Sequence, residues 1–101
     1  MPLRLRYRIN EGINITEDRR SIDVIVRDLT FDSINPRVSL ELHEDGIIHN
    51  VELLLGKAYS VTPNCTLYIP KNKERRIRTS VFIQIDATSE VEFGEKREYP
   101  L

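Results

Sequence analysis

Apolar and polar residues alternate along most of this chain, and this period of two is the feature that most constrains its fold. Successive side chains of a strand point to opposite faces, so the pattern is typical of strands with one buried face. The composition agrees, because 12 isoleucines and 7 valines stand against 2 alanines, and β-branched residues favour strands over helices. The residues that we expect to form the core are Ile22, Val24, Val26, Val38, Leu40, Leu42, Val61, Leu67, Ile69, Val81, Ile83 and Ile85.

The alternating runs predict an all-β fold, a small antiparallel barrel or sandwich of about seven short strands. No linker divides the chain, so residues 1–101 are expected to form a single domain. Residues 47–58 are ambiguous, because their apolar positions fit a helical stripe as well as a strand. The Asp45-Gly46 pair just before them favours a tight hairpin, and therefore a strand.

A weak internal repeat is also visible, dividing the chain into units of residues 3–50 and 51–99. At an offset of 43 residues, Val24 falls on Leu67 and Leu42 falls on Ile85; at an offset of 46, Ile13 falls on Tyr59. Chance agreement between alternating patterns is the other explanation. If the repeat is real, each unit is too small to bury its apolar face alone, so two pseudo-equivalent units would share one core.

Several classes of function are disfavoured by the composition. Fifteen basic residues against 16 acidic ones exclude a strongly basic nucleic-acid tail. A single cysteine excludes an internal disulfide or a multi-cysteine zinc site. No stretch is long and apolar enough to span a membrane, and no signal peptide opens the chain, so we expect a cytoplasmic protein. We find no catalytic motif or phosphate-binding glycine loop, and expect neither an enzyme nor a cofactor.

Arg4, Arg6 and Arg8 form the local pattern that most strongly indicates a binding site. Residues two apart on a strand lie on one face about 6.6 Å apart, so three guanidinium groups could follow a phosphate backbone or contact guanine edges. The alternative is a solvated strand face, or charges that protect an exposed sheet edge from pairing.

Other candidates are weaker. The basic run of residues 71–78 could capture phosphates, although a solvated hairpin tip would look the same. Tyr7, Tyr59 and Tyr68 could stack on bases, but core or cross-strand packing is the simpler interpretation.

Metal binding and thiol chemistry have little support. His43 and His49 lie on either side of a predicted turn, but two histidines without a third firm ligand are typical of an ordinary surface. Cys65 has no histidine near it in sequence and is expected to be a buried structural residue.

The chain resembles the carbon storage regulator family of small homodimeric proteins, which bind RNA and repress translation. The segments that carry the resemblance are Leu3–Ile15 (LRLRYRINEGINI), Ile22–Val26, Arg37–Leu42, Val81–Ala87, Val91 and Glu95–Tyr99. The resemblance implies a bacterial or phage regulator with two such units in tandem, a single-chain stand-in for the family's intertwined dimer. A homodimer of this chain is the other arrangement it allows.

The departures from the family pattern concern its RNA-binding residues. The family uses an arginine near the end of its last strand, and the matching positions here are Glu52 and Glu95. The turn proline that follows Ala87 in the family is replaced by Thr88. The second unit also lacks a basic opening strand, so the resemblance implies at most one RNA site.

Two hypotheses follow. In the first, the protein is an RNA-binding post-transcriptional regulator that binds an mRNA hairpin through the residues Arg4, Arg6, Arg8, Lys96 and Arg97. In the second, the fold serves as a non-enzymatic protein-interaction or assembly module and binds no RNA.

Overall fold

The computed structural model describes residues 2–32, 35–70 and 79–101, and in these ranges the chain is all-β, as predicted. It contains ten strands there rather than about seven, and no helix that could cross a membrane is found in them. The strands are β1 (Pro2–Arg8), β2 (Glu11–Glu17), β3 (Arg20–Asp32), β4 (Asn35–Glu44), β5 (Ile47–Leu54), β6 (Tyr59–Thr62), β7 (Cys65–Tyr68), β8 (Ser80–Ala87), β9 (Val91–Phe93) and β10 (Arg97–Glu98).

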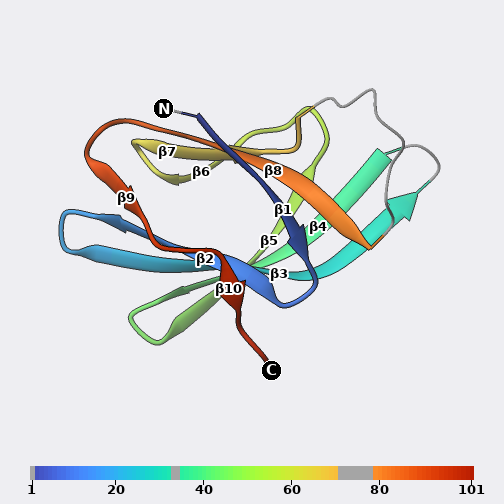
Figure 1. The fold of residues 1–101 in the computed structure, drawn as a ribbon, viewed down its shortest axis with the longest axis horizontal. Helices are drawn as coiled ribbons and strands as arrows, with labels where there is room; N and C mark the ends of the chain where they lie inside the picture. The colour runs from blue at the N-terminus through green and yellow to red at the C-terminus, as the bar shows by residue number, and fades with distance from the viewer. Residues whose placement is uncertain (1, 33–34, 71–78) are drawn as a thin grey trace.

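The strands form two antiparallel sheets that lie one above the other (Figure 1). The upper sheet has four strands in the order β1-β8-β7-β6. The lower sheet has the order β10-β2-β3-β4-β5, and β9 also pairs with β2. Strand β1 descends across the upper sheet and turns into β2 of the lower sheet, so the first turn of the chain connects the two layers.

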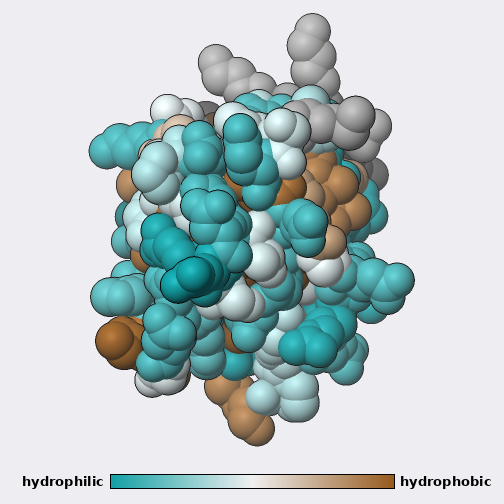
Figure 2. Space-filling model, turned by 90° about the vertical axis from the view of Figure 1, so that its left-hand side faces the viewer, coloured by the Kyte–Doolittle hydropathy of each residue, from teal (hydrophilic) through white to brown (hydrophobic). Residues whose placement is uncertain are grey.

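All twelve residues predicted for the core are buried between these sheets. They are joined there by Tyr7 from β1, Ile13 and Ile15 from β2, and Leu53 from β5. The outside is different: the face shown in Figure 2 is mostly hydrophilic, with separate smaller apolar areas. The alternation along the strands therefore divides the residues between core and surface as the sequence indicates.

The ambiguous segment is a strand, and its turns explain why. Asp45 and Gly46 have φ angles of 52° and 76°, the left-handed values that a two-residue hairpin requires. Strand β5 therefore folds back on β4, with Glu44 opposite Ile47. After β5 the chain turns again at Gly56, where φ is 83°.

Gly12 lies where β2 passes close to β3. A Cβ atom at this position would lie only 2.3 Å from the main-chain oxygen of Val24 and 2.9 Å from Cα of Ile25. Only glycine therefore permits this separation of the two strands.

The C-terminal residues cover part of the lower sheet's outer face. The hydroxyl of Tyr99 donates to Oδ1 of Asp23 at 3.2 Å, and its main-chain nitrogen donates to the oxygen of Asn10 at 2.7 Å. Arg27 also donates to the main-chain oxygen of Tyr99. Tyr99 thus spans Asp23 and Arg27, which explains how Ile25, between them on the outer face, is only 2% exposed.

Candidate nucleic-acid interface

The side chains of Arg4, Arg6 and Arg8 are all exposed on one face of β1. They alternate with Leu3 and Leu5, which are half-buried, and with Tyr7, which is in the core. Because β1 is an edge strand that pairs only with β8 in its sheet, the three arginines form a row along the rim of the upper sheet.

Two of these arginines lie against residues of β8. Nη2 of Arg4 donates to Oε1 of Gln84 at 3.0 Å. Cζ of Arg6 lies 4.6 Å from the centre of the Phe82 ring, a cation–π contact. Within the described part of the chain, no carboxylate forms an ion pair with Arg4 or Arg6. Their positive charge is therefore held in place by neutral groups and is not neutralised.

Arg8 is at the end of the row, where β1 turns into β2. Its main-chain nitrogen donates to Oε1 of Glu11 at 2.7 Å. That bond fixes the backbone at the turn and leaves the Arg8 side chain exposed.

The structure brings Lys96 to the row but not Arg97. Nζ of Lys96 donates to the main-chain oxygen of Arg6 at 2.9 Å, at the edge of β1 that faces away from β8. Arg97 instead contacts the ring of Tyr99, with Cζ 4.6 Å from its centre. Since Tyr99 is bonded to Asp23 on the outer face of the lower sheet, these two neighbouring basic residues serve different surfaces.

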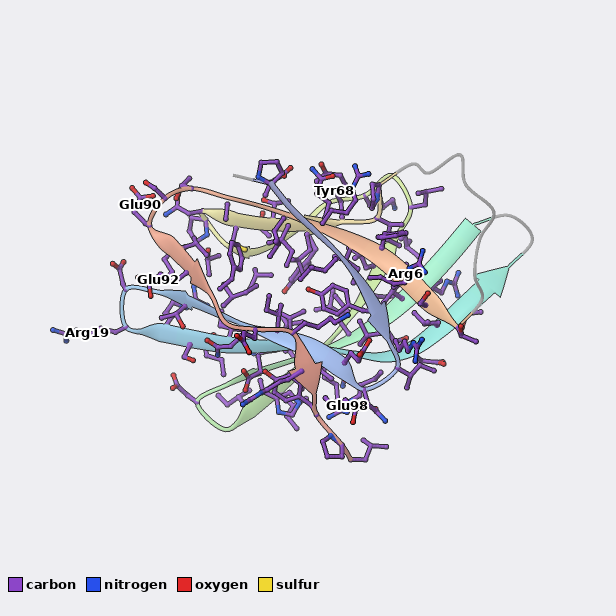
Figure 3. All side chains as sticks on the ribbon, viewed as in Figure 1. Arg6, Arg19, Tyr68, Glu90, Glu92 and Glu98 are labelled. Carbon is purple, nitrogen blue, oxygen red and sulfur yellow. The ribbon has the colours of Figure 1, made fainter. Side chains whose placement is uncertain are left out.

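The three tyrosines considered as stacking residues have different positions. Tyr7 is in the core, and Tyr59 is partly buried and packs against the core. Tyr68 is on the outer face of β7, and in Figure 3 it lies at the top of the molecule, away from the lower sheet. Partial burial and a hydrogen bond with Asp86 raise the pKa of Tyr68, although nearby Arg4 lowers it. Tyr68 is consequently neutral at physiological pH.

Phe82 belongs to this surface but was not among the sequence candidates. It lies between Val81 and Ile83, both buried in the core, so its side chain points outward beside Arg6. The alternation of the 81–85 segment already placed Phe82 on the outer face. A large aromatic residue on a solvent face was the signal that could have found it.

The histidines and the cysteine offer no metal centre. Nε2 of His43 is 3.0 Å from Oε1 of Glu41, and the described residues contain no group of three potential metal ligands. Cys65 is buried, and burial raises its pKa to about 11, so its thiol is unreactive at neutral pH. The basic run of residues 71–78 lies outside the described residues.

The outer face of the upper sheet thus combines unneutralised arginines with partly exposed aromatic rings. Arginine and aromatic side chains together can bind the phosphates and bases of a nucleic acid. Comparison of the chain with protein-family models, with curated proteins and with solved structures finds no match.

Proposed function

We propose that this protein is an RNA-binding post-transcriptional regulator that binds an mRNA hairpin through the row of Arg4, Arg6 and Arg8. The observation that carries the proposal is the exposure of all three guanidinium groups on one face of an edge strand. Lys96, bonded to the main chain of Arg6, adds a fourth positive charge beside the row. Arg97 contacts Tyr99 at the outer face of the other sheet, so it is not part of the proposed site.

Strand registers support the internal repeat, which the tandem arrangement of two regulator-like units requires. Val24 pairs with Leu42 between β3 and β4. Adding 43 to both numbers gives Leu67 and Ile85, which pair between β7 and β8. The same strand pairing thus occurs at the same register in both proposed units.

The exchange of strands between the units supports the comparison with an intertwined dimer. Strand β1 from the first unit completes the sheet of the second by pairing with β8, and β9 from the second unit pairs with β2 of the first. Strand β5 is the equivalent of β1 at the offset of 46, and β4 is the equivalent of β8 at the offset of 43. Their pairing is also equivalent, because Val51 lies opposite Leu40 and Leu5 lies opposite Ile83.

Only one of these two equivalent strands is basic. Adding 46 to the numbers of Arg6 and Arg8 gives Glu52 and Leu54 on β5. Glu52 is paired there with Arg37 at 2.8 Å. We therefore expect one RNA hairpin for each chain rather than two.

The proposal is tested by titrating the protein with an RNA hairpin that has GGA in its loop, with a scrambled-loop hairpin as the control. Binding through three arginines and one lysine should give a plot of log affinity against log salt with a slope of roughly −3 to −4. Isothermal titration should show one hairpin bound to each chain. Equal affinity for the scrambled loop would reject the regulator, even though the surface binds RNA.

Charge reversal tests the site itself. Arg6→Glu combined with Arg8→Glu should abolish specific binding, while the circular dichroism spectrum remains that of the folded protein. The matched control is Arg19→Glu with Lys57→Glu, because both residues are exposed, lie outside the row and give the same change in net charge. Unchanged affinity in the first variant, or equal loss in the control, would remove the arginine row as the binding site.

A second candidate function is favoured by the exposed apolar residues of β5. Ile47 and Ile48 are 58% and 53% exposed, next to the free edge of the lower sheet. Such an edge can pair with a second copy of the chain. If the protein is an assembly module, sedimentation should show dimers that Ile48→Lys converts to monomers, with no dependence on RNA.

A further inference from the structure

Two aromatic side chains share the outer face of the upper sheet with the arginine row. Phe82 on β8 and Tyr68 on β7 are both half-buried. Their chain neighbours Ile83 and Leu67 are in the core, so both rings point to the opposite, outer side.

The contacts place these rings next to each other and next to the arginines. Phe82 lies opposite Arg6, and the Arg6 guanidinium covers its ring. Gln84 lies opposite Tyr68 on one side and accepts a hydrogen bond from Arg4 on the other. Phe82 and Tyr68 are therefore diagonal neighbours on adjacent strands, a relation in which side chains are about 7–8 Å apart.

We propose that Tyr68 and the stacked pair of Arg6 and Phe82 bind two successive unpaired bases of a single-stranded RNA segment. This inference rests on the proposed function and adds the side chains that hold the bases of the hairpin loop. Aromatic rings and guanidinium planes both serve as stacking surfaces for unpaired bases. Bases within a duplex are already stacked on each other, so these surfaces could not contact their faces.

The order of groups across the sheet fits this type of ligand. The arginine row is at the rim, where Arg4 and Arg8 can bind phosphates, and the rings lie one and two strands further in. The neutral Gln84 lies between Arg4 and Tyr68, accepts from Arg4 and donates from Nε2 to Oδ1 of Asp86 at 3.1 Å. A single-stranded nucleic acid matches both parts of the surface, because its phosphates suit the arginine row and its flat bases suit the rings.

The experiment compares two hairpins with identical phosphates: one has an intact loop, and the other has abasic sites at the loop positions. Phe82→Leu and Tyr68→Leu should each weaken binding to the intact hairpin by about 5- to 30-fold. They should leave binding to the abasic hairpin within about twofold, because only phosphate contacts remain there. Phe93→Leu is the matched control, since Phe93 is a half-buried aromatic residue that packs against the core from β9.

A spectroscopic signal gives a second test. The chain has four tyrosines and no tryptophan, so its intrinsic fluorescence comes from tyrosine. A base stacked on Tyr68 should quench part of that fluorescence. Tyr68→Phe should retain the affinity for the intact hairpin but lose this quenching.

The outcomes separate the inference from the proposed function. Loss of binding in the arginine variants but not in Phe82→Leu or Tyr68→Leu would overturn base stacking and leave the regulator standing. Equal loss on the intact and abasic hairpins would overturn stacking as well, because the effect would not depend on bases. If the wild-type protein binds neither hairpin, or binds polyglutamate equally well through the same residues, both proposals fail.

Discussion

Replacing Gly12 by alanine should destabilise the protein strongly, because two strands would have to move apart. The new Cβ would lie 2.3 Å from the main-chain oxygen of Val24, against about 3.4 Å for an ordinary contact. Strands β2 and β3 would have to separate by about 1 Å, which breaks ladder hydrogen bonds next to the Gly12–Ile25 pair. Two lost bonds with partly unsatisfied groups cost about 2–4 kcal/mol, or roughly 10–30 °C in melting temperature.

Urea unfolding followed by circular dichroism measures this loss. Gly46→Ala is the control, because its new Cβ would meet nothing within 4 Å and only the φ angle of 76° would be strained. That strain should cost about 1–2 kcal/mol. A Gly12→Ala protein with the unfolding midpoint of the wild type would refute the close approach of β2 and β3.

Three further predictions concern the core and its titratable groups. Val81→Asp should leave no cooperative thermal transition, because it buries an unpaired charge; a normal melting curve would contradict the strand assignment. Hydrogen bonds from His43 and Arg27 hold the pKa of Glu41 below its usual value, so the unfolded chain takes up this proton at higher pH and stability falls on acidification. Glu41→Gln should therefore lose less stability than the wild type between about pH 6 and about pH 3 in urea titrations, and an identical loss would exclude this coupling. Cys65, with a pKa of about 11, should react with a thiol reagent at neutral pH about a hundredfold more slowly in the folded protein than in urea; equal rates would show that it is not buried.

The core could be predicted from the sequence because the period of a strand is a local property. Residues such as Val24, Leu40 and Ile83 need only their neighbours in the chain to show which face they occupy. The shortest strands were beyond this method, since β9 and β10 have three and two residues. A period of two cannot be recognised in so few positions.

Much less of the candidate site could be predicted, because it depends on which strands pair. The sequence placed Arg6 and Phe82 on outward faces, but their contact follows from the register of β1 against β8. Likewise, Lys96 and Arg97 are adjacent in sequence but contact different sheets. Lys96 bonds the main chain of β1, whereas Arg97 lies in β10, which pairs with β2. Alternation carries no information about pairing between distant strands.

The pairing of β1 with β8 also determines when the protein can fold during its synthesis. The strand with the arginine row ends at Arg8, and its partner begins only at Ser80. Contacts between such distant parts of a chain form slowly, because a long loop must close before they stabilise anything. Strand β1 thus joins its sheet only after β8 has been made, and the arginine row takes its native position no earlier than that.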